Sequence, residues 1–155
     1  MRTRVLFVCH GNICRSPMAE FVMKTLVREA GAEDRFEIAS AATSREELGN
    51  PVYPPARREL AAHGISCAGK TARQMTRGDY DGWDLLIGMD NANRRNMLRI
   101  TGGDPEGKIS LLPEWVPGGA ALPEIDDPWY TGRFSEVYRQ IDEGCRGLLQ
   151  ALLHP

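Results

Sequence analysis

Cysteine is scarce in this sequence, with four among 155 residues. So few cysteines argue against the disulfide scaffold of a small secreted protein, and no Cys-x-x-Cys motif or Cys/His cluster indicates a zinc site. Neither sign of charge is in large excess, because 19 basic and 21 acidic residues leave a net charge of -2. We therefore expect neither nucleic acid nor a membrane surface as a partner.

Long apolar runs are also missing. No segment approaches the roughly 18 apolar residues of a membrane-spanning helix, and the short apolar run near the N-terminus is followed by no small-residue cleavage site. These features predict a cytoplasmic protein. We also expect a monomer or a weak dimer, a state that no sequence feature determines. A chain of 155 residues can bury a sizeable core, so we expect a single domain over residues 1–155.

Strand-like and helix-like segments alternate along the chain. Buried strands are predicted at residues 4–9, 36–39, 83–89 and 108–112. Helices are predicted at residues 55–62, 91–99 and 134–152. A further helix is predicted to begin at Pro17, with Ser16 as its N-cap, and to end at Gly31. The alternation predicts an α/β fold of three layers, a four-stranded parallel sheet with helices on both faces.

The last third of the chain holds a long loop and an amphipathic helix. Residues 113–131 are rich in proline and glycine, and loops of that length in compact domains are usually functional. Apolar side chains of residues 134–152 fall on one stripe of the final helix. Gly144 and Gly147 each weaken this helix by about 1 kcal/mol, so packing must hold it.

The chemistry is concentrated in the segment CHGNICRSP, residues 9–17, directly after the first strand. A short loop entering a helix directs several backbone N–H groups and the positive end of the helix dipole toward one point, where an anion can bind. Gly11 and Asn12 tolerate the positive φ that such a loop requires. Cys9 is expected to be a thiolate there, and Arg15 offers a planar fork to two phosphate oxygens.

A thiolate beneath a bound tetrahedral oxyanion is an arrangement for phosphoryl transfer. Because the loop amides and Arg15 would already neutralise the phosphoryl charge, we expect no metal ion and no cofactor.

The string VLFVCHGNICRSPMAE, residues 5–20, resembles the signature of the low-molecular-weight protein tyrosine phosphatases, with its Cys-x5-Arg-Ser loop. Other segments resemble that family in order and spacing: SAATSREELGNP at 40–51, HGI at 63–65, ARQ at 72–74, WDLLIGMDNAN at 83–93 and DDPWY at 126–130. The resemblance implies the flavodoxin-like fold of that family. It also implies hydrolysis of phosphotyrosine in proteins, and of small aryl phosphates, through a phosphocysteine intermediate with release of inorganic phosphate.

The resemblance also implies roles for individual residues. Cys9 would be the nucleophile, Ser16 would donate its hydroxyl to the thiolate, and Asp127 would act as general acid and then as general base. The residues alone leave Asp126 open as the acid. The phosphoryl oxygens would be held by the Arg15 side chain and by the backbone amides of His10, Gly11, Asn12, Ile13, Cys14 and Arg15.

Two further roles concern residues around the loop. The resemblance implies that Ser40 and His63 hold Asn12, although His63 also fits a polar residue at a helix end. Cys14 is either an inert loop residue or a redox partner that captures an oxidised Cys9 in a disulfide, and the resemblance favours the second. The two remaining cysteines fit packing positions.

The walls of the crevice depart from the family pattern. Ile13, Trp129 and Tyr130 would contact the aryl ring of the substrate. Trp129 stands where the family usually has tyrosine, and Glu46 stands where several members carry an aromatic residue. A carboxylate at residue 46 would repel acidic residues that flank the phosphotyrosine.

Three other functions compete with tyrosine phosphatase activity. Protein-arginine phosphatases of this type tend to have threonine at the position of Ile13 and to lack the equivalent of Tyr130. Arsenate reductases need two further cysteines in relay, and residues 89–97 contain none. A non-catalytic anion-binding module would not need a nucleophile, an acid and a supporting serine together.

Overall fold

The computed structural model describes residues 2–155 and contains a parallel sheet of four strands in the order β2-β1-β3-β4. The strands are β1 (Thr3–Cys9), β2 (Phe36–Ala42), β3 (Leu85–Gly88) and β4 (Ile109–Leu111). The helices are α1 (Arg15–Glu29), α2 (Pro54–Ala62), α3 (Asp79–Gly82), α4 (Asn91–Thr101), α5 (Pro128–Thr131) and α6 (Phe134–Leu153), with the 3-10 turns η1 (Glu33–Arg35) and η2 (Leu112–Trp115). The predicted α/β class and the parallel sheet are confirmed.

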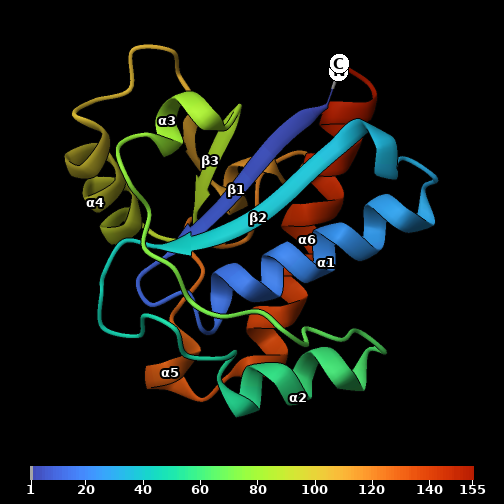
Figure 1. Ribbon diagram of the computed structural model, residues 1–155. Helices are drawn as coiled ribbons and strands as arrows, with labels where there is room; N and C mark the ends of the chain where they lie inside the picture. Colours follow the sequence, from blue (N-terminus) through green and yellow to red (C-terminus); the bar gives the residue numbers. More distant parts are fainter. Residues whose placement is uncertain (1) are drawn as a thin grey trace.

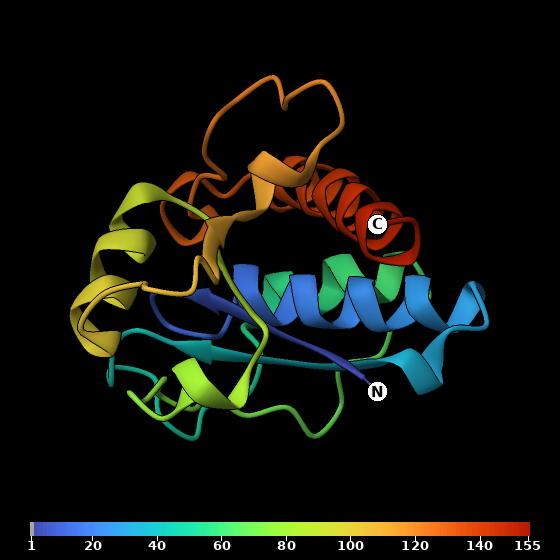
Figure 2. The ribbon, with the colours of Figure 1, turned by 90° about the horizontal axis from the view of Figure 1, so that it is seen from above.

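Helices cover both faces of the sheet (Figures 1 and 2). In β1, Val5 and Phe7 pack into the core beneath α1 and α6, whereas Leu6 and Val8 pack into the core on the side of α3 and α4. Successive side chains of a strand point to opposite faces, so a strand covered on both sides is apolar throughout. The uninterrupted apolar run of β1 follows from this position in the middle of the sheet.

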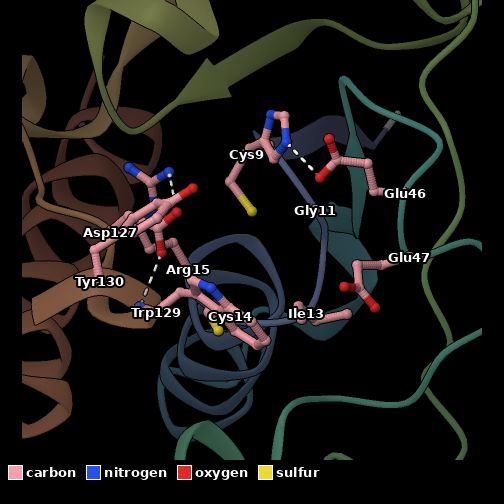
Figure 3. A pocket seen from close by; sticks show the side chains of 11 residues that line it. Cys9, Gly11, Ile13, Cys14, Arg15, Glu46, Glu47, Asp127, Trp129 and Tyr130 are labelled. Carbon is pink, nitrogen blue, oxygen red and sulfur yellow. Dashed lines mark hydrogen bonds and ion pairs between the residues drawn. The ribbon is translucent and has the colours of Figure 1, made fainter. Parts of the chain in front are cut away.

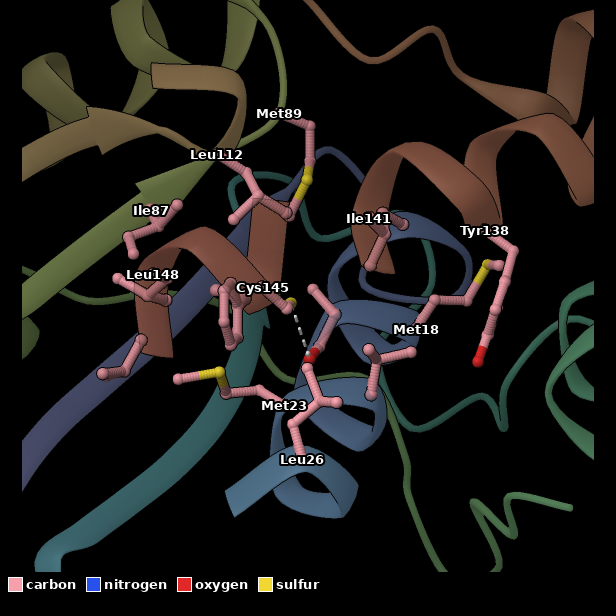
Figure 4. Packing of buried hydrophobic residues seen from close by; sticks show 14 of the residues in the cluster. Met18, Met23, Leu26, Ile87, Met89, Leu112, Tyr138, Ile141, Cys145 and Leu148 are labelled. Carbon is pink, nitrogen blue, oxygen red and sulfur yellow. Dashed lines mark hydrogen bonds between the residues drawn. The ribbon is translucent and has the colours of Figure 1, made fainter. Parts of the chain in front are cut away.

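The larger core lies between α1 and α6 and the sheet (Figure 4). Gly144 and Gly147 lie where α6 crosses η2. A Cβ at residue 144 would lie 2.5 Å from Leu112 Cγ, and one at residue 147 would lie 2.1 Å from the Trp115 carbonyl oxygen. The two glycines therefore cost helix propensity but permit a close approach that a larger residue would prevent.

The start of α1 differs from the prediction. The helix begins at Arg15 rather than Pro17, and Cys14, not Ser16, occupies the N-cap position, with no side-chain capping bond. Ser16 lies in the first turn, and its hydroxyl is hydrogen-bonded to groups of the preceding loop instead. Its side chain therefore serves the loop and not the helix end.

The bounds of the strands also differ from the predictions, most of all in β2 and β3. β2 extends to Ala42 instead of residue 39, because its small C-terminal residues pair with the end of β1 up to Cys9. β3 begins only at Leu85, since the Trp83 amide donates to the Asp79 carbonyl and completes α3, which the sequence did not predict.

The expected long loop at 113–131 contains η2 and α5, and α5 lies near the end of the sheet where β1 and β2 terminate (Figure 1). The segment after β2 is hydrogen-bonded to the loop after β1, through Thr43 N to Cys9 O at 2.9 Å. The long loop joins the end of β3 through Ile125 N to Met89 O at 2.9 Å. The carboxyl ends of the strands thus gather the segments that carry the predicted site, as in other open parallel sheets. Among the helices of residues 2–155, none combines the length and the hydropathy of a membrane-spanning segment.

Candidate active site

The loop of residues 9–15 connects β1 to α1 and curls around one point (Figure 3). Asn12 has a φ of 58°, and within residues 2–155 it is the non-glycine residue with a positive φ. The expectation for Asn12 is confirmed, whereas Gly11 does not adopt that conformation. A Cβ at residue 11 would instead come within 3.4 Å of Glu47 Cγ.

Cys9 lies at the bottom of this loop and is 3% exposed. Its Sγ is 3.0 Å from Ser16 Oγ and 3.4 Å from the Ser16 backbone nitrogen. A thiolate at Cys9 accepts hydrogen bonds from both groups at the N-terminus of α1, where the helix dipole also favours negative charge.

Arg15 is 2% exposed, and its guanidinium is fixed by three acceptors. Nη1 donates to Asp90 Oδ2 at 2.6 Å and to the Ile125 carbonyl at 2.8 Å, while Nη2 lies 3.5 Å from Asp127 Oδ2. Burial alone would lower the pKa of Arg15. The Cys9 thiolate and the two carboxylates outweigh that effect and raise this pKa above its ordinary value. The guanidinium is therefore a fixed positive charge beside the sulfur.

Asp127 and Asp126 have different surroundings. Asp127 lines the same pocket as Cys9 and Arg15, with its side chain 24% exposed, and its Oδ1 accepts from the Trp129 amide at 3.1 Å as the N-cap of α5. Asp126 is exposed and does not line the pocket. Of the two candidate acids, the fold brings Asp127 to the sulfur and leaves Asp126 outside.

The pocket around Cys9 has an apolar and an acidic side (Figure 3). Ile13, Trp129 and Tyr130 line it together with Glu46, so the predicted contact residues are brought together. Trp129 is half exposed and packs on Tyr53 at 4.6 Å between ring centroids. Tyr53, which no sequence motif had indicated, holds the indole against the body of the protein.

Residues 4–154 match a family of proteins described as low molecular weight phosphotyrosine protein phosphatase. The chain belongs to this family. It is 38% identical over 148 residues to low molecular weight protein-tyrosine-phosphatase YfkJ of Bacillus subtilis, which covers 96% of this chain and 94% of that protein. It is 39% identical over 150 residues to the low molecular weight phosphotyrosine protein phosphatase of Gallus gallus, covering 94% of this chain and 93% of that one.

The crystal structure of YfkJ from Bacillus subtilis matches with a TM-score of 0.95 at 37% identity, covering 99% of this chain and 96% of that structure. The predicted family is confirmed. These phosphatase relatives do not favour the arginine phosphatase or arsenate reductase alternatives.

In this low molecular weight phosphatase family member, Asn12 is the centre of a buried hydrogen-bond network. Its Nδ2 donates to Ser16 Oγ at 2.7 Å and to Ser40 Oγ at 2.9 Å, and its Oδ1 accepts from the Arg73 amide at 3.2 Å. Because Ser16 accepts from Asn12, its single hydroxyl proton can go to the Cys9 sulfur at 3.0 Å or to the Ala41 carbonyl at 3.5 Å, and the sulfur is the nearer acceptor. The expected contact between Ser40 and Asn12 is present.

His63 does not join this network. Its Nε2 lies 3.2 Å from Glu59 Oε2, and its ring stacks on Tyr138 at 3.8 Å between centroids. The prediction that His63 holds Asn12 is therefore wrong, because His63 ends α2 and faces α6.

The network ends instead at Glu20 and Lys70, neither of which was predicted from the sequence to hold the loop. Ser40 Oγ donates to Glu20 Oε1 at 2.6 Å, and Lys70 Nζ donates to the Ser40 carbonyl at 2.9 Å and lies 3.4 Å from the same carboxylate oxygen. Burial lowers the pKa of Lys70, an effect that Glu20 opposes. Glu20 is the last residue of the segment that resembles the family signature, so the sequence did offer it as a candidate. No comparable signal marks Lys70 between the HGI and ARQ segments.

The other cysteines differ from Cys9. Cys14 lines the pocket but is 4% exposed, and burial raises the pKa of its thiol, as does the negative charge of Cys9. Cys145 is fully buried in the core and its thiol pKa is raised by the same cause. Cys67 is buried as well. Within residues 2–155, no group of three or more His, Cys, Asp or Glu residues is arranged to hold a metal ion.

Proposed function

We propose that this protein hydrolyses phosphotyrosine in proteins, and small aryl phosphates, through a covalent phosphocysteine. The observation that carries the proposal is the convergence of three groups on one pocket, the Cys9 sulfur, the Arg15 guanidinium and the Asp127 carboxyl. A nucleophile, a fixed positive charge and a proton donor are the groups that transfer of a phosphoryl group from a phenol requires.

In the first step, the Cys9 thiolate attacks phosphorus and the bond between phosphorus and the tyrosyl oxygen breaks. The protonated Asp127 carboxyl gives its proton to the departing phenolate. Arg15 and the backbone amides of residues 10–15 bind the three equatorial oxygens, whose charge they offset without reorganising. The products of this step are a tyrosine residue and a phosphocysteine.

In the second step, Asp127 accepts a proton from a water molecule that attacks phosphorus, and the bond between phosphorus and sulfur breaks. The departing sulfur leaves as a thiolate. Ser16 stabilises it by donating its hydroxyl proton over the 3.0 Å that separates Oγ from Sγ. Inorganic phosphate is released, and the enzyme returns to its starting protonation state.

The shape of the pocket favours an aromatic ester. Ile13 and Trp129 both line the pocket and offer apolar surface against which a phenyl ring can pack. A phosphoarginine would need a polar partner for its guanidinium, and Ile13 supplies no hydroxyl. We therefore expect phosphotyrosine to be preferred over phosphoarginine.

The test is phosphate release from a phosphotyrosine peptide, with phosphoserine and phosphoarginine peptides in parallel and arsenate-dependent thiol consumption measured with a thioredoxin system. Cys9→Ser is expected to lose phosphotyrosine hydrolysis by several orders of magnitude while still binding inorganic phosphate. Cys67→Ser, a matched change at a buried cysteine outside the pocket, is expected to keep it. Substantial activity in Cys9→Ser would contradict the mechanism.

A further inference from the structure

The two side walls of the pocket carry different chemistry (Figure 3). The wall from residues 127–130 presents aromatic rings. The opposite wall comes from the segment that follows β2 and presents two consecutive carboxylates, Glu46 and Glu47. Both line the pocket that already contains Cys9, so they flank the place where the substrate binds.

Glu46 is held in place by the phosphate-binding loop itself. His10 Nε2 and Glu46 Oε2 are 2.9 Å apart, and because a carboxylate can only accept, the imidazole nitrogen is the donor. This bond directs one oxygen of Glu46 toward the loop, and the side chain remains largely exposed, at 69%. The backbone of the segment is anchored to the same loop through Ser44 N to His10 O at 3.0 Å.

Glu47 is similarly oriented. Its Oε2 accepts from Asn50 Nδ2 at 2.6 Å, and its Cγ lies against the backbone of Gly11, where a Cβ would be 3.4 Å away. The neighbouring cation in the sequence, Arg45, is exposed and does not line the pocket. The guanidinium of Arg15 is buried and bonded to Asp90, so it does not offset the charge of the rim.

These positions determine what a bound peptide meets. A phosphotyrosine side chain places its phosphate on the loop and its ring between Ile13 and Trp129, so the peptide backbone crosses the rim of the pocket. Residues adjacent to the phosphotyrosine then pass over the wall that carries Glu46 and Glu47. A lysine or arginine there gains attraction, whereas aspartate or glutamate is repelled.

We propose that Glu46 and Glu47 are specificity-determining residues that select phosphotyrosine flanked by lysine or arginine. This inference rests on the proposed function, because it concerns the substrate of the same pocket. Exposed charge pairs are weak and screened by salt, so each carboxylate is expected to change kcat/KM by about two- to fivefold. The selectivity therefore resides in the pair and falls as ionic strength rises.

The experiment compares three phosphotyrosine peptides of one length, with the residues on both sides of the phosphotyrosine being lysine, alanine or glutamate. The wild type is expected to rank them lysine, alanine, glutamate in kcat/KM, each value divided by that for para-nitrophenyl phosphate, which has no flanking residues. The double variant Glu46→Gln with Glu47→Gln is expected to lose most of this spread, and Glu46→Lys to reverse its order.

Glu33→Gln is the matched control, because this exposed glutamate lies in η1 before β2, at the opposite end of the sheet. It removes the same charge and is expected to keep the wild-type ranking. Equal rates of the wild type on all three peptides, or an unchanged ranking in the double variant, would overturn the selectivity and leave the phosphatase activity intact. Release of phosphate from none of the peptides would overturn the proposed function as well.

Discussion

The hydroxyl of Ser40 donates a hydrogen bond to the carboxylate of Glu20, with 2.6 Å between Oγ and Oε1, and both residues are buried. Glu20 can only accept, so it directs Ser40, and Ser40 together with the Arg73 amide directs the side-chain amide of Asn12. Ser40 must accept from Asn12, and Ser16 also accepts from Asn12, so the Ser16 proton turns to Cys9 Sγ at 3.0 Å, which is nearer than the Ala41 carbonyl at 3.5 Å. A carboxylate in α1 thereby orients the hydroxyl that stabilises the leaving thiolate.

Glu20→Gln tests this orientation. The amide of glutamine can donate to Ser40, and Ser40 can then donate to Asn12 if the Asn12 amide turns over and loses its bond from the Arg73 amide. The Ser16 proton would then point to Asn12 Oδ1 and no longer to Cys9. We expect kcat to fall about tenfold, with a smaller change in kcat/KM, because release of the thiolate in the second step is affected most. Rapid-mixing kinetics with para-nitrophenyl phosphate would show a larger burst of nitrophenol in the variant.

Glu29→Gln is the control for this experiment, since Glu29 is the exposed last residue of the same helix. It is expected to behave as the wild type does. Equal losses of kcat and kcat/KM in Glu20→Gln, with no larger burst, would indicate a general structural effect and contradict the orienting role.

Asp127→Asn keeps the oxygen that caps α5 but removes the acidic proton. We expect hydrolysis of a phosphotyrosine peptide to fall about 10²- to 10³-fold, because the phenolate of tyrosine is a poor leaving group without protonation. Para-nitrophenyl phosphate should lose much less, since nitrophenolate departs more readily. Asp126→Asn, a matched change at the exposed neighbour, should alter neither rate, and a large loss in that variant would reassign the acid.

The sequence predicted the parts of the site that are local and missed those that the tertiary structure brings together. The loop from Cys9 to Arg15 is one continuous stretch between a strand and a helix, so its role follows from spacing. Asp90 and Lys70 reach the site only because the strand order places the ends of β1, β2 and β3 side by side.

The error at His63 has the same origin. The histidine makes no hydrogen bond to Asn12, because its Nε2 is paired with Glu59 and its ring is packed on Tyr138 from α6. A motif match assigns a residue type to a role, but only the packing of α2 shows which way the side chain points. The two glycines of α6 show the same limit of sequence reasoning. By propensity alone they only weaken the helix, and the reason for them is found in their close contacts with η2, about 30 residues earlier in the chain.

Alkylation should distinguish the cysteines. Burial raises the pKa of the Cys14 and Cys145 thiols, so both are expected to remain protonated and unreactive near neutral pH. Iodoacetate at pH 6.5 should therefore modify Cys9 first, and inorganic phosphate should protect it. Cys9 and Cys14 lie between Arg4 and Arg15 and share one tryptic peptide, so fragment spectra must assign the site. Labelling of Cys14 as fast as Cys9 would contradict the prediction.

Asp79 gives the fold a defined pH dependence. Burial alone would raise its pKa, but hydrogen bonds from Arg73, Thr76 and Trp83 outweigh this and hold the pKa below the ordinary value of 3.8. A depressed folded-state pKa stabilises the protein at pH values above 3.8, and the effect is lost as the pH falls through the folded-state pKa. Asp79→Asn should thus reduce the free energy of unfolding by about 1–3 kcal/mol at pH 7 and by much less at pH 3.

Urea unfolding at the two pH values measures this difference, with the exposed Asp34→Asn as the matched control. An equal destabilisation by Asp79→Asn at pH 7 and pH 3 would show that its charge is not the cause. The result also concerns the site, because Asp79 bonds the guanidinium of Arg73, whose backbone amide binds Asn12.

Gly147→Ala tests the close contact between α6 and η2. The new Cβ would lie 2.1 Å from the Trp115 carbonyl oxygen, a backbone atom that cannot turn away as a side chain can. Helix propensity alone would make the alanine more stable by about 1 kcal/mol, but overpacking costs about 1–3 kcal/mol or more. We expect net destabilisation and a melting temperature several degrees lower.

Gly82→Ala, in α3 with no atom within 4 Å of its Cβ, should be neutral or stabilising. A Gly147→Ala protein as stable as wild type would mean that η2 moves away at little cost, and the long loop that carries Asp127 would then be less firmly held than its contacts indicate.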